Sequence, residues 1–352
     1  KIQILLNKIN FMKKYSFKND YSEWCHPNIL QALSSINFEQ QEWYWEDIYS
    51  IEARKLIQEK IWNKNSEIYF VSWWTQANLI VISSILKPYE SVICVDTWHI
   101  NVHEAWAIES TWHKINFVKS KDWKITSKDI QNILDIHGND HHMVKPKMVY
   151  ISNSTEIWTI YSKKELNEIS KICKKNNLFL FMDWARLGSA LCSKENDLTL
   201  KDIAKLTDVF YIWWTKNWAL LGEAIVINNE NLSKDFLYNI KQKWWLLAKW
   251  SLLWVQFLEL FKNDLFFDLS KHANNMAWKL NETIKNKWYD FLTNSTTNQI
   301  FPIFPNEIIK KLNKKFDFYT WQKIDENNSA IRLVTSWTTK EKSVDEFIRE
   351  LN

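Results

Sequence analysis

The chain has 352 residues, enough for one large domain with a smaller appendage. Its 45 basic and 41 acidic residues are scattered without a basic block, so we expect no nucleic-acid partner. No stretch reaches about 18 consecutive apolar residues, and the four cysteines lack C-x-x-C spacing, so we expect a cytoplasmic protein with no membrane partner and no metal site.

The N-terminal segment, residues 1–16, is predicted to be a leader that does not belong to the native domain. Its apolar patch is interrupted by Asn7 and Lys8 and is not followed by a small-residue cleavage site, so it is not a signal peptide. We expect Met12 to be the natural start and residues 1–11 to be upstream readthrough, which N-terminal peptide sequencing tests.

Short apolar runs alternate with amphipathic segments between residues 66 and 227. We expect strands at 68–72, 91–96, 147–152, 178–183 and 209–212, with helices such as 76–86 and 163–177 between them. This alternation predicts an α/β fold with a mostly parallel sheet covered on both faces. Ligands of such sheets bind outside the carboxyl ends of the strands.

The pattern changes near residue 250. Long helical stretches lead to a few short strands and to a final helix, EKSVDEFIREL. We therefore predict a large domain over residues 17–250 and a small α+β domain over residues 251–352.

Tryptophan and glycine have an unusual distribution. The chain has 23 Trp and 3 Gly, whereas average usage predicts roughly 25 Gly in a chain of this length. Pairs such as Trp73–Trp74 and Trp213–Trp214 stand inside polar turns. We therefore hypothesise that the source organism reads UGA as Gly and that this sequence was translated with UGA as Trp. The alternative is a Trp-rich binding protein without catalysis, whose aromatic residues would lie on one face of a helix or strand.

Lys216 follows a predicted strand in the segment IWWTKNWALLGEA. If the flanking Trp are Gly, a flat ring can approach this lysine closely, and a partly desolvated amine is suited to Schiff-base formation. A solvated loop lysine is the other interpretation. Asp183 ends a predicted strand some thirty residues earlier, where a carboxylate can keep a pyridine nitrogen protonated. An Asp at a strand end can equally cap a helix.

Two further motifs precede these residues. Trp73, Trp74 and Thr75, read as Gly-Gly-Thr, form a strand–turn–helix junction whose backbone amides suit a phosphate group. His99 follows another predicted strand, where a histidine can stack on a ring or transfer protons. His103 and Glu104 come next, and we expect His103 to have a structural or supporting role.

With Trp read as Gly, the motifs GGTQANL, HINVHEAGA, MDGARLGSAL, GGTKNGA and IRLVTS resemble the low-specificity threonine aldolase and β-eliminating lyase family of fold-type I pyridoxal phosphate enzymes. The resemblance covers residues 17–350. It implies pyridoxal 5'-phosphate as cofactor and cleavage of L-threonine or L-allo-threonine to glycine and acetaldehyde. It also implies a homodimer or homotetramer with shared active sites. β-Elimination on another amino acid is the alternative within the family.

The same resemblance implies roles for individual residues. Lys216 is the Schiff-base residue, Asp183 binds the pyridine nitrogen and His99 stacks on the ring. The remaining implied residues are Arg186 close to the cofactor, Lys243 and Lys249 reaching a neighbouring subunit's phosphate, Arg332 on the substrate carboxylate, and Ser22 and Tyr44 near the substrate.

The sequence departs from the family at one catalytic position. Many threonine aldolases have a histidine in the loop that corresponds to Ser154–Glu156, and this chain has none there. The general base is then Glu156, His99 or a phosphate-activated water. Trp321 and Trp337 stand where this branch of the family carries Trp, and we expect both to be genuine.

Overall fold

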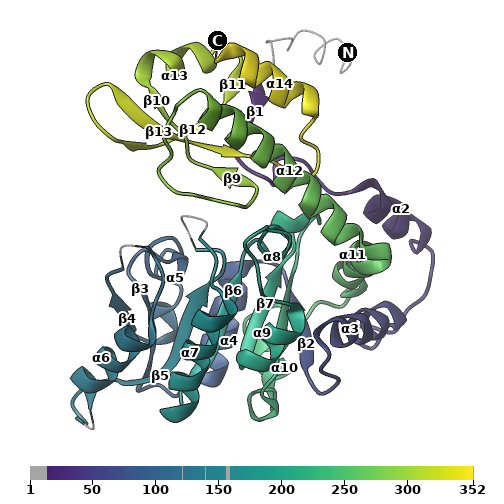
Figure 1. The fold of residues 1–352 in the computed structure, drawn as a ribbon. Helices are drawn as coiled ribbons and strands as arrows, with labels where there is room; N and C mark the ends of the chain where they lie inside the picture. The colour runs from purple at the N-terminus through teal and green to yellow at the C-terminus, as the bar shows by residue number, and fades with distance from the viewer. Residues whose placement is uncertain (1–13, 121, 139, 156–158, 352) are drawn as a thin grey trace. The chain divides into compact units, whose positions relative to one another are not determined.

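A computed structural model describes residues 14–120, 122–138, 140–155 and 159–351 (Figure 1). The chain divides into two compact units, one formed by residues 24–271 and the other by residues 1–23 and 272–352. Met12, and with it most of the predicted leader, lies outside the described residues. None of the helices in the described ranges has the length and apolar character needed to cross a bilayer.

The larger unit is built on a seven-stranded sheet in the order β2-β8-β7-β6-β5-β3-β4. The strands from β7 through β4 pair in parallel, as expected, whereas β8 pairs antiparallel with both β2 and β7. The strands are β2 (Glu67–Val71), β3 (Glu90–Val95), β4 (Ile115–Val118), β5 (Lys145–Ser152), β6 (Phe179–Trp184), β7 (Val209–Trp213) and β8 (Glu223–Ile227). This arrangement confirms the predicted α/β class with a mostly parallel sheet.

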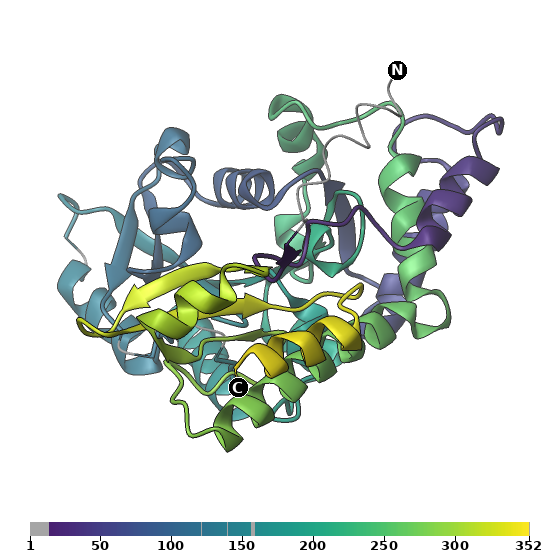
Figure 2. The ribbon, with the colours of Figure 1, turned by 90° about the horizontal axis from the view of Figure 1, so that it is seen from above.

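Helices cover both faces of this sheet. In Figures 1 and 2, α7 (Lys163–Lys175) and α9 (Leu200–Leu206) lie on the face opposite α4 (Trp74–Ile85). Both α7 and α9 begin with a capping box, in which a Ser or Thr and an acidic residue three positions later bond each other's backbone N–H. The other helices of the unit are α2 (Pro27–Ser35), α3 (Ile48–Ile61), α5 (His99–Val102), α6 (Ser127–His137), α8 (Leu187–Leu191), α10 (Phe236–Gln242) and α11 (Ser251–Phe261).

The smaller unit is an α+β structure. Strand β13 (Asn328–Val334) pairs antiparallel with β10 (Ile303–Pro305), β12 (Tyr319–Lys323) and β9 (Gln299–Ile300). Its helices are α12 (Leu265–Asn286), which begins in the larger unit, α13 (Asn306–Leu312) and α14 (Glu341–Glu350). Phe17, Leu280, Ile331 and Phe347 are among the residues of its buried core.

The division of the chain differs from the predicted boundary near residue 250. Helix α11 packs against α2 and α3 and therefore belongs to the larger unit. At the other end, Tyr15–Ser16 forms β1, which pairs in parallel with β11 (Phe316–Asp317). These two residues of the predicted leader are thus part of the smaller unit's structure.

Candidate active site

Lys216 lies directly beyond the carboxyl end of β7. It stands in a short 3₁₀ turn, Thr215–Asn217, and its side chain is half-buried. The Lys216 Nζ atom is 3.5 Å from the centroid of the Trp213 ring and 5.4 Å from that of the Trp74 ring. These cation–π contacts bring the lysine to the junction between β2 and α4. The structure therefore joins two motifs that are about 140 residues apart in the sequence.

Asp183 is buried on β6, and its Oδ2 accepts a hydrogen bond from the Tyr150 hydroxyl on β5. Tyr211 is the register partner of Asp183 on β7. Burial raises the pKa of Tyr211 well above its usual range, and the charge of Asp183 raises it further. Tyr211 therefore keeps its proton next to this carboxyl group, which already accepts a hydrogen bond from Tyr150.

His99 begins the short helix α5 after β3. Its Nδ1 lies 3.0 Å from Oε1 of Glu104, and the same oxygen accepts a hydrogen bond of 2.8 Å from the Asn78 amide on α4. The side chain of Glu104 has no exposed surface. Because a carboxylate that already accepts from Asn78 favours a second donor, the arrangement selects the His99 tautomer with a proton on Nδ1. The exposed His103 ring lies 5.5 Å from the His99 ring.

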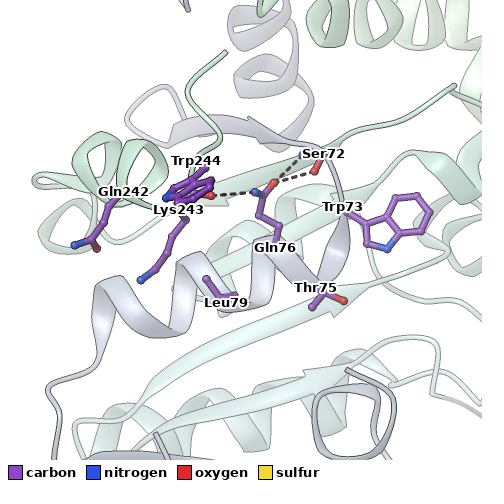
Figure 3. A pocket seen from close by; sticks show the side chains of 8 residues that line it. All are labelled: Ser72, Trp73, Thr75, Gln76, Leu79, Gln242, Lys243 and Trp244. Carbon is purple, nitrogen blue, oxygen red and sulfur yellow. Dashed lines mark hydrogen bonds between the residues drawn. The ribbon is translucent and has the colours of Figure 1, made fainter. Parts of the chain in front are cut away.

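The predicted phosphate turn has the expected backbone. Strand β2 ends at Val71, and Trp73 is the N-cap of α4. A pocket of about 490 Å³ beside this turn is lined by Ser72, Trp73, Thr75, Gln76, Leu79, Gln242, Lys243 and Trp244 (Figure 3). Gln76 links the two sides of the pocket, since it accepts from the Ser72 hydroxyl and donates to the carbonyl of Lys243.

The remaining predicted site residues lie on other segments of the chain. Arg186 is buried at the start of α8, directly after β6, and Lys249 is exposed. The N–H of Tyr44 donates to the carbonyl of Ala248 within the larger unit. Ser22 and Arg332 belong to the smaller unit. Glu156, one candidate for the general base, lies outside the described residues.

Arg332 is held in a defined orientation within the smaller unit. Its Nη2 donates to the carbonyl of Lys18, and its guanidinium carbon lies 5.1 Å from the ring centroids of both Tyr319 and Trp321. Aromatic rings on a guanidinium reduce its conformational freedom. Such an arginine is well prepared to bind a carboxylate.

Sequence reasoning missed Glu223. This carboxyl is fully buried on β8 and accepts hydrogen bonds from the N–H of Trp214 at 3.0 Å and the hydroxyl of Thr215 at 3.4 Å. Burial raises the pKa of Glu223 well above its usual range, although the charge of Lys216 opposes this shift. A lone acidic residue in the apolar run LLGEAIVI is the signal that identifies it.

The raised pKa of Glu223 predicts a pH dependence of stability. The folded protein binds the Glu223 proton more tightly than the unfolded chain does, because the pKa of a glutamate in an unfolded chain is about 4.3. As pH rises above that value, the unfolded chain loses the proton first, so the free energy of unfolding falls. Glu223→Gln keeps the neutral form. We expect its melting temperature to exceed that of the unsubstituted protein by a margin that widens with pH. A margin independent of pH, or an equal effect of Glu230→Gln at an exposed position, would contradict this account.

The polar groups of the site suit pyridoxal 5'-phosphate, but the indole rings do not. Lys216, Asp183 and His99 supply an amine, a carboxylate and a ring, the groups to which the family resemblance gives roles at the cofactor. The Trp74 ring, however, lies 5.6 Å from the His99 ring and 4.0 Å from the Trp213 ring. An indole therefore lies edge-on beside His99, the ring on which the family resemblance places the cofactor. With Trp74 and Trp213 in place, the site does not fit this cofactor.

Comparison with known proteins agrees with the family resemblance. Residues 27–293 match the model of the beta-eliminating lyase family. A low-specificity L-threonine aldolase from a Pseudomonas species is 29% identical over 340 residues, which cover 95% of each chain. The structure of a Leishmania major threonine aldolase has 43% identity and a TM-score of 0.93, and covers 96% of this chain and 98% of its own.

A more distant similarity concerns the fold alone. An aspartate aminotransferase from Thermus thermophilus is 10% identical, with a TM-score of 0.68 over 99% of this chain and 95% of its own. Its fold-type I architecture agrees with the sheet described above. Since the family model covers about three quarters of the sequence, this chain belongs to the beta-eliminating lyase family.

Proposed function

We propose that this protein is a pyridoxal phosphate-dependent lyase that cleaves L-threonine or L-allo-threonine to glycine and acetaldehyde. The observation that carries the proposal is the position of Lys216, Asp183 and His99 at the carboxyl-end side of three strands of one sheet, β7, β6 and β3. The enzymes of its family use this cofactor. The similar proteins from Pseudomonas and Leishmania major are both named threonine aldolases, and the Leishmania protein has 43% sequence identity to this chain.

Within this site we assign to His99 the role of holding a proton from the substrate. The hydrogen bond between Nδ1 and Glu104 fixes the ring and leaves Nε2 as the acceptor nitrogen. Cleavage of a β-hydroxy amino acid requires removal of the hydroxyl proton, and an imidazole acceptor is suited to this near neutral pH. Glu104 and Asn78 then act as positioning residues, because they reach the substrate only through His99.

The products distinguish this proposal from β-elimination. Protein purified from its source organism should release equimolar glycine and acetaldehyde from threonine. Pyruvate and ammonia from serine, cysteine or tryptophan, without acetaldehyde from threonine, would instead assign the protein to elimination. Absorbance in the region of the protein-bound cofactor gives an independent check that the purified protein is loaded.

Arg332 is proposed to bind the substrate carboxylate. Loss of a charge-assisted hydrogen bond costs about 1.5 to 3 kcal/mol, so Arg332→Ala should raise KM roughly 10- to 150-fold. The cofactor absorbance should not change, since the proposed role concerns the substrate only. Arg349→Ala, at an exposed position on α14, is the matched control. An unchanged KM would remove Arg332 from the site.

We also propose a cytoplasmic homo-oligomer. The described cysteines are all free, and Cys25, Cys94 and Cys173 are buried, which agrees with a reducing compartment. Lys243 borders the pocket beside the phosphate turn, and the resemblance gives it and Lys249 a role at a neighbouring subunit's phosphate. Light scattering of the native protein should give the mass of a dimer or tetramer. A monomeric mass at assay concentration would contradict shared sites.

A further inference from the structure

Tryptophan occupies backbone conformations that normally require glycine. Of the 13 non-glycine residues with positive φ in the described ranges, seven are tryptophan, although tryptophan is only 23 of 352 residues. In this left-handed region Cβ approaches the neighbouring carbonyl oxygen, so glycine adopts it readily and bulky residues rarely do. The seven residues have φ from +56° to +80° and are Trp62, Trp106, Trp112, Trp123, Trp218, Trp244 and Trp288.

Several of these residues end helices in a motif that favours glycine. After α3, the N–H of Asn63 donates to the carbonyl of Gln58, five residues earlier, across Trp62. The same hydrogen bond spans Trp244 after α10 and Trp288 after α12. This is the Schellman arrangement, in which the residue at the left-handed position is most often Gly and sometimes Asn. Asn177 occupies that position after α7.

The side chains of Trp244 and Trp288 give no packing reason for their presence. The Trp244 and Trp288 side chains are 89% and 94% exposed, so almost none of either indole is buried. A residue retained for its hydrophobic surface would be buried. The helix ends at Trp244 and Trp288 thus have a left-handed backbone but bury little of the indole.

The tryptophans at the candidate active site are crowded instead. The centroid separations of the Trp73–Trp74 and Trp74–Trp213 ring pairs are both 4.0 Å, closer than the usual range of about 4.5 to 7 Å. The buried indole N–H groups of Trp74, Trp213, Trp214 and Trp218 have no hydrogen-bond partner among the described residues. Buried polar groups are normally paired.

Trp321 shows what an accommodated tryptophan looks like in this protein. It stands on strand β12, its backbone φ is not positive, and its ring packs edge-on against Phe301 at 5.4 Å. The Arg332 guanidinium lies over the same ring. A glycine here would remove contacts that the exposed Trp244 and Trp288 do not have.

We infer that glycine, not tryptophan, occupies the seven left-handed positions and positions 73, 74, 213 and 214 in the protein that its source organism makes. The corresponding codons are then UGA read as glycine, whereas Trp321 is encoded by UGG. The left-handed backbone at the helix ends does not depend on the proposed function. Only the displacement of the cofactor by the active-site indoles rests on that function.

The first test compares the codons of the gene with the residues found in peptides of the native protein. UGA should encode the residues at positions 62, 244 and 288, and tandem mass spectrometry of peptides from the source organism should show Gly there. The peptide that contains Trp321 should show Trp from a UGG codon. Tryptophan in the native peptides at the three helix ends would overturn the inference. Neither result depends on catalytic activity, so failure here is distinct from failure of the proposed function.

A second test uses one exposed helix end. In the chain that carries glycine at the other positions named above, Trp288→Gly should raise the melting temperature, because glycine has no Cβ to strain the left-handed backbone. Trp288→Ala is the matched control, since it removes the same indole but keeps a Cβ, and it should raise the melting temperature less. Trp321→Gly should lower it. Equal effects of Gly and Ala at position 288, or stabilisation by Trp321→Gly, would contradict the inference.

Discussion

The chain produced with all 23 tryptophans is expected to be poorly soluble and to bind no pyridoxal phosphate. Overpacking costs about 1 to 3 kcal/mol per site, and each buried unpaired donor costs about 1 to 3 kcal/mol. The left-handed backbone adds about 1 to 2 kcal/mol per residue. Several such sites together exceed the total stability of about 5 to 15 kcal/mol that a domain has.

The version with glycine at the motif positions, which keeps Trp321 and Trp337, should be soluble and bind the cofactor. The measurement compares soluble yield and cofactor absorbance for the two chains under the same conditions. A third chain that also carries Trp321→Gly and Trp337→Gly is the control, and it should melt at a lower temperature. Equal cofactor binding by the chain with all tryptophans would refute the recoding argument.

Replacing Lys216 by alanine should abolish activity while some cofactor stays bound. Loss of the amine should lower the rate of threonine cleavage by several orders of magnitude, because the covalent attachment of the cofactor is lost. The backbone turn before α4 and Asp183 remain to hold part of the cofactor. Lys216→Arg keeps a positive charge but not the nucleophilic amine, so it should be equally inactive.

The control for Lys216 is an exposed lysine of the same unit. Lys171→Ala changes an exposed side chain on α7, and it should leave the rate nearly unchanged. A Lys216→Ala protein with more than a few per cent of the original rate would remove Lys216 from the centre of the proposal. Partial activity of Lys216→Arg would point to charge as the contribution of this residue.

The apolar runs predicted the strands of the parallel sheet because these strands are buried on both faces. For example, the run at 178–183 becomes β6, and its terminal Asp183 lies beside Tyr150 as a result of strand pairing. Strand β8 is not among the strands expected from the sequence, and its antiparallel direction could not be predicted either, because a short apolar run does not indicate the orientation of a strand. The sequence pattern changes near residue 250, whereas the larger compact unit continues to residue 271, because tertiary packing of α11 on α2 and α3 places that helix in the larger unit.

Only the main residues of the candidate site could be predicted from the sequence. Lys216 and Asp183 follow recognisable strands, whereas Glu223 lies within one, where its contact with Thr215 depends on the pairing of β7 with β8. The hydrogen bond between His99 and Glu104 likewise depends on the turn that ends α5. The left-handed backbone at Trp244 and Trp288 could be anticipated only from the excess of Trp over Gly.

The central claim is that Lys216 is the residue that binds the cofactor covalently. Borohydride reduction of the cofactor-loaded glycine version, followed by digestion and peptide mapping, tests it most directly. The account predicts a pyridoxyl group on the peptide that contains Lys216 and none on that peptide in Lys216→Ala. A pyridoxyl group on another lysine, or on none, would contradict the account.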